Sequence, residues 1–289
     1  MGVIEVKNLS KHFKDVRAVD AICFSVEKGE IFGFLGPNGA GKTTTIRCMM
    51  DFIRPTSGEI RILGMDSQKN SVELKKKIGY LSGQLRLYDK WTGQDHIDFV
   101  KNLNGDNDIA QSICKRFDFD PSLKVKTLSS GNKQKLGIVM AFMTRPEILI
   151  MDEPTNALDP LLQNTTYELI EEVTKQGTTV FFSSHNLAEV DRICHRVGII
   201  KKGKIVATES IHNLKEMRLY SVAIDFKSGF DKRIFQFEGI QIKKILPKSI
   251  MLTVKGDVNS LLKKLSTLNV HDVEIQHATL EDIFLEYYE

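Results

Sequence analysis

Apolar residues in the first 210 positions fall into short blocks separated by glycine, proline and polar turns. A helical pattern follows Lys42, and the blocks after residue 146 contain consecutive apolar residues, as in "ILIM" at 148–151. Unbroken apolar runs are typical of parallel strands buried on both faces, whereas half-exposed strands alternate. The pattern therefore predicts an α/β core with strands at 3–8, 22–26, 31–35, 58–63, 77–82, 147–153, 178–185 and 196–208.

The pattern changes twice along the chain. From about 92 to 145, apolar positions recur with helical spacing, which predicts a helical subdomain at about 85–145. Beyond about 218, short alternating stretches such as "YSVAIDF" and "SIMLTVKG" surround the helical pattern "VNSLLKKLSTL". We therefore expect a main domain over 1–218 and a small C-terminal α+β domain over 219–289.

Composition narrows the possible functions. The 289 residues carry 40 Lys plus Arg against 37 Asp plus Glu, so the net charge of +3 gives no electrostatic reason to expect nucleic acid as a partner. The four cysteines are far apart and form no C-x-x-C pair, as expected for small buried residues in a reducing compartment. No apolar run approaches the roughly 20 residues that span a membrane, and the first ten residues lack a signal-peptide pattern. We therefore expect a cytoplasmic chain.

A glycine-rich turn joins the predicted strand at 31–35 to the helix after Lys42. Its sequence, "GPNGAGKT", fits the phosphate-binding pattern G-x-x-x-x-G-K-[ST]. Backbone N–H groups can surround a phosphate only where side chains do not obstruct them, and the helix adds its positive N-terminal end. A dinucleotide-binding turn needs G-x-G-x-x-G and has no use for the Lys-Thr pair. The turn predicts ATP and Mg²⁺ binding through Gly36, Pro37, Asn38, Gly39, Ala40, Gly41, Lys42, Thr43 and Thr44, with Lys42 on the phosphates and Thr43 on the metal ion.

Two acidic residues end the apolar strand "ILIMDE". Because ligands bind at the carboxyl edge of a parallel sheet, Asp152 and Glu153 should lie beside the glycine-rich turn. Asp152 can hold Mg²⁺ through water, and Glu153 can polarise the attacking water. These roles predict hydrolysis of the bound nucleotide.

Three further stretches resemble motifs of one family. "LSSGNKQK" (128–135) resembles the signature sequence of ABC-type ATPases, "MDEPTNALDP" (151–160) their Walker B motif and D-loop, and "FFSSH" (181–185) their H-loop. The set spans residues 1 to about 210 in the family's order. The resemblance implies a P-loop NTPase fold of the ABC-ATPase type, with a parallel sheet, an antiparallel side sheet and a helical subdomain. It also implies ATP hydrolysis as the activity.

The resemblance implies a head-to-tail dimer with ATP between two nucleotide-binding domains. Ser129 and Gly131 would then contact the γ-phosphate of the ATP bound to the other copy, and Asp159 would lie at the dimer interface. His185 would contact the γ-phosphate and the attacking water. Phe13 occupies the position of an aromatic residue that stacks on adenine, although a core phenylalanine is the alternative.

The chain departs from the family pattern in two motifs. Relatives often read "GYLPQ" where this chain reads "GYLSGQ", so Gly83 stands at the usual glutamine and Gln84 follows it. Either the loop shifts and brings Gln84 to the Mg²⁺ and the water, or that contact is weakened. The signature has Ser130 and Asn132 in place of the commoner glycine and glutamine, while Ser129 and Gly131 are retained.

The resemblance also implies partners. In transporters of this family the segment at 83–100 meets the membrane-embedded permease subunit, so Tyr88 and Trp91 are candidate anchors there. The ending "ATLEDIFLEYY" resembles tails of bacterial ATPases that work with separate export permeases. We therefore expect the ATPase subunit of an exporter of drugs, antimicrobial peptides or lipids, held at the inner face of the cell membrane by its permease. A second copy of the chain is the preferred dimer partner, and a related ATPase chain is the alternative.

Two other functions are consistent with such motifs. A soluble ABC-type ATPase acting on ribosomes or DNA normally carries two cassettes or long coiled coils, whereas this chain has one cassette and no sustained heptads. A regulatory subunit with little turnover would not need the full set of Lys42, Asp152, Glu153 and His185.

Overall fold

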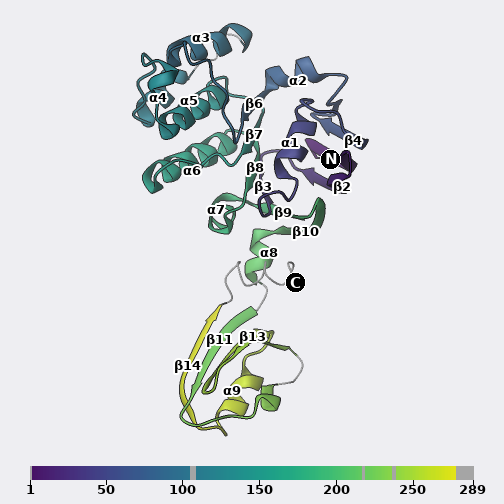
Figure 1. Cartoon of the computed structure of the whole chain (residues 1–289), viewed down its shortest axis with the longest axis vertical. Coiled ribbons are helices and arrows are strands. Elements are labelled where there is room, and N and C mark those ends of the chain that lie inside the picture. The colour runs from purple at the N-terminus through teal and green to yellow at the C-terminus, as the bar shows by residue number, and fades with distance from the viewer. Residues whose placement is uncertain (1, 105–108, 217–218, 236–238, 278–289) are drawn as a thin grey trace. The chain divides into compact units, whose positions relative to one another are not determined.

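The computed structural model describes residues 2–104, 109–216, 219–235 and 239–277 (Figure 1). The chain forms two compact units, residues 1–208 and 209–289, and each has its own hydrophobic core. The domain boundary predicted at residue 218 lies outside the described residues.

A six-stranded sheet forms the centre of the first unit. The strand order is β10-β9-β3-β8-β7-β6, and the pairs β9/β3, β3/β8, β8/β7 and β7/β6 are parallel. Every residue of β3, β7 and β8 is buried, which confirms the parallel α/β core predicted from the apolar runs. The strands are β3 (Ile31–Leu35), β6 (Ile78–Leu81), β7 (Ile148–Asp152), β8 (Thr179–Ser184), β9 (Arg196–Lys201) and β10 (Lys204–Ser210).

A four-stranded antiparallel sheet lies beside this core. Its order is β2-β1-β4-β5, with β1 (Ile4–Phe13), β2 (Val16–Val26), β4 (Ser57–Ile62) and β5 (Met65–Asp66). The strands β1 and β2 extend well beyond the predicted 3–8 and 22–26 because register shifts let the ribbon continue through polar, partly exposed positions. The single run predicted at 196–208 is two strands, β9 and β10, which turn at Lys202 and Gly203.

Phenylalanine side chains pack the two sheets of the first unit together. Phe34 of β3 lies 5.4 Å from Phe24 of β2 and 5.3 Å from Phe181 of β8 between ring centroids. Ile46 of α1 (Lys42–Met49) belongs to the same buried cluster. This packing fixes the start of α1, and with it the glycine-rich turn, at the carboxyl end of β3.

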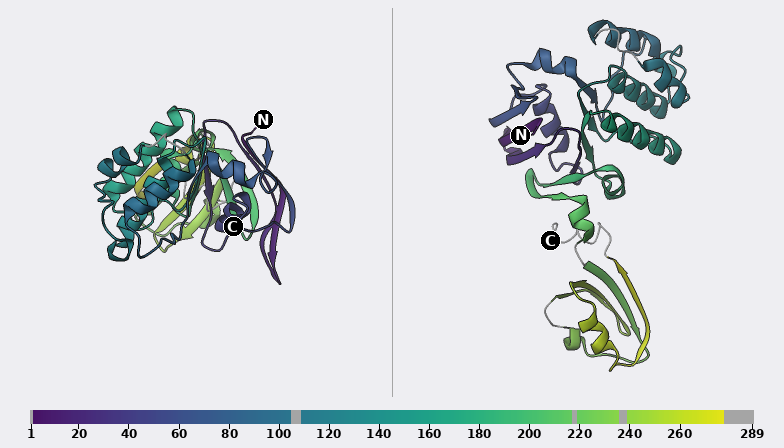
Figure 2. Two further views of the ribbon diagram at one scale, coloured as in Figure 1. Left: turned by 90° about the horizontal axis from the view of Figure 1, so that it is seen from above. Right: turned by 180° about the vertical axis from the view of Figure 1, so that it is seen from behind.

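The other helices of the first unit surround the six-stranded sheet. Figures 1 and 2 show α3, α4 and α5 on the side of this sheet away from β1, β2 and β4. These helices lie within the predicted helical subdomain. The bounds are α2 (Ser71–Lys77), α3 (Gly93–Asn104), α4 (Ala110–Arg116), η1 (Val125–Thr127), α5 (Ser130–Phe142), α6 (Pro160–Lys175) and α7 (Leu187–Ile193).

The second unit is a small α+β fold, as predicted. Within the described residues of this unit, four strands form antiparallel pairs in the order β12-β13-β11-β14. The elements are α8 (Ile211–Glu216), β11 (Leu219–Phe226), η2 (Lys232–Phe235), β12 (Ile240–Ile245), β13 (Ser249–Lys255), α9 (Asn259–Leu265) and β14 (Val270–His277). The tail whose sequence resembles export ATPases, residues 278–288, lies outside the described residues. In the described part of the chain, no helix combines the length and apolar character needed to cross a bilayer.

Candidate active site

The glycine-rich turn at 36–41 depends on its glycines and on neighbouring backbone. A Cβ at Gly36 would lie 2.3 Å from the carbonyl oxygen of Ile200, so no other residue fits there. Gly41 adopts a φ of 113° at the N-cap of α1 and offers no side-chain cap. The N–H groups of the first helical turn are therefore available to an anion. The N–H of Gly36 also donates to the carbonyl oxygen of Ser184, 3.2 Å away, which ties the turn to the end of β8.

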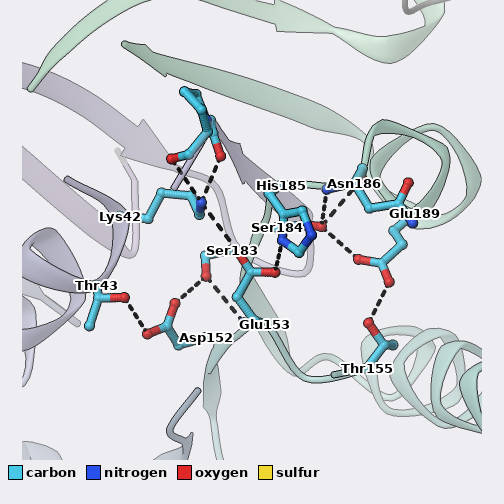
Figure 3. A network of polar contacts seen from close by, with 12 residues as sticks. Lys42, Thr43, Asp152, Glu153, Thr155, Ser183, Ser184, His185, Asn186 and Glu189 are labelled. Atoms are coloured by element: carbon cyan, nitrogen blue, oxygen red, sulfur yellow. Dashed lines mark hydrogen bonds and ion pairs between the residues drawn. The ribbon is translucent and has the colours of Figure 1, made fainter. Parts of the chain in front are cut away.

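Lys42, Glu153 and His185 form a chain of polar contacts at the edge of the central sheet (Figure 3). The Nζ atom of Lys42 lies 3.2 Å from Oε1 of Glu153 and donates to the carbonyl oxygen of Gly36 at 2.6 Å. The Nδ1 atom of His185 lies 2.6 Å from Oε2 of Glu153. Because β7 and β8 are parallel neighbours, Glu153 and His185, which follow them, reach the same edge. The site thus combines a cation for phosphate, a carboxylate and an imidazole.

Thr43 and Asp152 meet beside this chain of contacts. The Thr43 hydroxyl donates to Oδ2 of Asp152 at 2.7 Å, and the Ser183 hydroxyl donates to Oδ1 at 2.5 Å. Asp152 is only 2% exposed, and both of its oxygens have hydroxyl partners. Hydroxyl and carboxylate oxygens are the hard ligands that Mg²⁺ prefers, and nucleotide sites hold Mg²⁺ by one or two such groups plus phosphate oxygens. The donor set therefore fits Mg²⁺. Ser183 was not predicted, because only the pairing of β7 with β8 brings it to Asp152.

A cavity of about 440 Å³ opens at this edge, and Lys42, Thr43, Asp152 and Glu153 contribute to its wall. The turn adds Asn38, Gly39, Gly41 and Thr44, whereas Gly36, Pro37 and Ala40 support the turn without lining the cavity. Further lining residues, which were not predicted from the sequence, come from the β1–β2 ribbon, from α1, from the loop after β7 and from the β9–β10 turn. These residues are Val16, Arg17, Ala18, Arg47, Asn156, Lys202 and Gly203. The basic residues among them add positive charge to a site predicted to hold phosphates.

Gln84 also lines the cavity, one residue beyond the usual glutamine position. Gly83 lies against Asp152, and a Cβ at residue 83 would be 3.3 Å from Oδ2 of that aspartate. The Ser82 hydroxyl holds the bend by donating to the carbonyl oxygen of Gln84 at 3.1 Å. The loop therefore keeps a glutamine at the cavity although residue 83 has no side chain.

The signature residues and Asp159 begin two helices. Ser129 caps α5 by accepting a hydrogen bond from the Asn132 N–H at 3.2 Å. Gly131 lies close to the turn after β7, because a Cβ there would be 3.1 Å from the carbonyl oxygen of Ala157. Asp159 caps α6 through its side chain. None of Ser129, Gly131 and Asp159 lines the cavity described above.

Phe13 lies at the end of β1 and is 46% exposed rather than packed in the core. It pairs with Val16 across the ribbon, and the Lys11 ammonium lies 4.9 Å from its ring centroid. Phe13 does not line the cavity itself, but Val16 does. Because Phe13 faces Val16 in the register of the β1–β2 ribbon, its exposed ring lies next to a residue that lines the cavity.

The fold and the site together define an ATP-hydrolysing P-loop protein. The family model "ABC transporter" matches residues 19–156. The chain is 30% identical to the ABC transporter ATP-binding protein YhcH of Bacillus subtilis over 98% of this chain and 95% of that protein. It is 36% identical to the bacitracin transport ATP-binding protein BcrA of Bacillus licheniformis over 74% of this chain and 72% of that protein.

The fold agrees with these similarities. The dimeric structure of MJ0796, a bacterial ABC transporter cassette, is 24% identical and superposes with a TM-score of 0.67 over 72% of this chain and 98% of that one. The chain belongs to the family of ABC transporter ATP-binding proteins. It is the ATP-binding and ATP-hydrolysing subunit of a membrane transporter. The names of these relatives describe transport and give no support to action on ribosomes or DNA.

Proposed function

We propose that this chain hydrolyses MgATP between two copies of itself arranged head to tail. The observation that carries the proposal is the division of the site. Lys42, Glu153 and His185 meet in one network, while Ser129 and Gly131 do not line the cavity of their own chain. The N-terminus of α5 suits a phosphate, and a second copy could bring it to the open side of the nucleotide. The dimeric arrangement of the structurally similar cassette supports this geometry.

Each residue then has one role in hydrolysis. Lys42 binds the β- and γ-phosphates, Glu153 accepts the proton of the attacking water, and His185 holds the water and the γ-phosphate in line. Thr43 and Asp152 would hold Mg²⁺, with Gln84, which also lines the cavity, as a further oxygen ligand, and the bound ion would supply positive charge to the phosphates. Phe13 stacks on adenine, and Asp159 lies at the interface between the copies.

The transported molecule belongs to the class of drugs, antimicrobial peptides or lipids, and it moves outward. The similarity to a bacitracin transport protein supports this assignment. A separate permease would hold the chain at the inner face of the membrane. The surface of this chain that would meet the permease contains the aromatic cluster of Tyr88, Trp91 and Phe99. The ring centroid of Trp91 lies 4.7 Å from that of Tyr88 and 5.8 Å from that of Phe99. Tyr88 is 64% exposed and Phe99 is 50% exposed, as anchors for a protein partner would be.

Affinity purification from the native cells in mild detergent tests the assignment to a separate permease. Mass spectrometry of the tagged chain should find a multi-span membrane protein in stoichiometric amount, and replacement of both Tyr88 and Phe99 by serine should remove it. The matched control is Val72→Ser, which alters an exposed apolar residue on α2 outside the aromatic cluster. Recovery of ribosomes or DNA-repair proteins without a membrane partner would contradict the proposal.

A further inference from the structure

Glu189 is a buried carboxylate that lies next to the catalytic loops without lining the cavity. It is 6% exposed and belongs to α7. Its Oε1 atom accepts hydrogen bonds from the Thr155 hydroxyl and from the Tyr167 hydroxyl, the latter at 3.1 Å. Its Oε2 atom accepts one from the Ser184 hydroxyl at 2.6 Å. Burial of an ionised carboxylate is costly unless hydrogen bonds replace its water, so these three hydroxyls account for its presence.

Two of the three donors lie close in sequence to the proposed hydrolytic residues (Figure 3). Thr155 lies two positions after Glu153, and Ser184 directly precedes His185. Glu189 therefore joins the loop after β7 to the end of β8. Ser184 extends the connection, because its carbonyl oxygen accepts from the N–H of Gly36 in the glycine-rich turn at 3.2 Å.

The loop after β7 has a backbone that needs outside support. Glu153 has a φ of 52° and Ala157 a φ of 63°, both in the left-handed region that non-glycine residues rarely adopt. Such conformations are strained and persist only where the surroundings determine them. The hydrogen bond from Thr155 to Glu189 lies between these two positions.

The third donor, Tyr167, anchors the same carboxylate from α6, an element that carries neither Glu153 nor His185. Burial and the adjacent Glu189 carboxylate raise the pKa of the Tyr167 hydroxyl, so it remains a donor throughout the physiological range. Arg192 packs over the Tyr167 ring at 4.9 Å from its centroid, which holds the ring in place.

We propose that Glu189 is a positioning residue for ATP hydrolysis, because its buried carboxylate fixes the loop of Glu153 and the loop of His185 in one relative position. The contact between Glu153 and His185, 2.6 Å from Oε2 to Nδ1, depends on that position. Glu189 itself touches neither nucleotide nor water in this account. The inference rests on hydrolysis at the proposed site.

Glu189→Gln tests the proposal with little change in volume. In glutamine, an NH₂ group that can only donate replaces one of the two carboxylate oxygens. The hydroxyls that donate to that oxygen therefore lose their acceptor. We expect kcat at saturating MgATP to fall about 10-fold with the KM for ATP changed less than about 2-fold, because small displacements of reacting groups reduce the chemical step more than binding. Glu168→Gln, an exposed carboxylate on α6, is the matched control and should retain normal kcat.

A pair of hydroxyl deletions separates positioning from a purely structural role. Thr155→Val removes the donor on the catalytic loop, and Tyr167→Phe removes the donor on α6 from the same carboxylate oxygen. If Glu189 positions the loops, kcat falls at least about 3-fold more in Thr155→Val than in Tyr167→Phe, even where their melting temperatures fall equally. This pair also decides the matter if Glu189→Gln does not fold.

Two results would overturn the inference. The first is an unchanged kcat in a folded Glu189→Gln variant. The second is a loss of kcat in Thr155→Val and in Tyr167→Phe that is proportional to the fall in melting temperature, with the same proportion in both variants. Turnover of the unmodified chain, measured in the same assay, keeps the two proposals apart. An inactive unmodified chain would contradict the proposed function, whereas an active one with unaffected variants would contradict only the role of Glu189.

Discussion

Glu153→Gln is expected to lower ATP turnover at least about 100-fold while ATP binding is retained, because the variant loses the general base. The carboxylate follows β7 and contacts both Lys42 and His185, at 3.2 and 2.6 Å. Glutamine keeps the shape and the hydrogen-bonding reach of the side chain, but its amide cannot accept the proton of the attacking water. Phosphate release would measure turnover, and titration with a fluorescent ATP analogue would measure binding.

Glu147→Gln is the matched control for this substitution. Glu147 directly precedes β7, is 55% exposed and pairs with Lys77 at the surface. The same change of charge at the other end of the strand should therefore leave turnover within about 2-fold, as expected for a surface ion pair of small energy. Near-normal turnover in Glu153→Gln would remove Glu153 from the catalytic role.

Lys42→Ala should reduce turnover by about 10²- to 10³-fold, the range for loss of one preorganised group that stabilises developing charge. The Lys42 ammonium is 6% exposed, and the carbonyl oxygens of Gly36 and Pro37 hold it at 2.6 and 3.3 Å. Its removal takes a fixed, buried cation from the phosphates. ATP affinity should fall in the same variant, in contrast to Glu153→Gln.

Lys77→Ala controls for the loss of a lysine that also pairs with a glutamate, here at the surface and away from the cavity. Turnover and ATP affinity should remain normal there. A Lys42→Ala protein whose turnover stays within about 3-fold of the unmodified chain would contradict the assignment of Lys42 to the phosphates.

The sequence predicted those parts of the site that are continuous in the chain. The glycine-rich turn with Lys42 and Thr43 is one unbroken motif, and Asp152 and Glu153 end a strand that is apolar throughout. The apolar runs also predicted the parallel core, because strands buried on both faces leave a clear signal. In these segments, local sequence is enough to place the side chain.

Other parts depend on contacts between distant segments. Ser183 and Glu189 are ordinary polar residues in sequence, and they become important only when β7 pairs with β8 and α7 packs beside them. Arg17 and Lys202 reach the cavity because the long β1–β2 ribbon and the β9–β10 turn lie beside the glycine-rich turn. Strand pairing over such separations cannot be read from one sequence, which also explains why the lengths of β1 and β2 were underestimated.

A mixing experiment with two variants shows whether ATP is hydrolysed between two copies of the chain. Lys42→Ala disables the phosphate-binding turn and retains the signature. Ser129→Asp retains the turn and introduces a negative charge at the signature, while aspartate remains a good N-cap for α5. Each variant alone should be nearly inactive.

In a head-to-tail dimer, a mixed pair contains one site with an intact Lys42 from one chain and an intact Ser129 from the other. Mixing the two purified inactive variants should therefore raise ATP turnover at least about 10-fold above either one alone. Turnover of the mixture that equals the average of the two separate variants would contradict it.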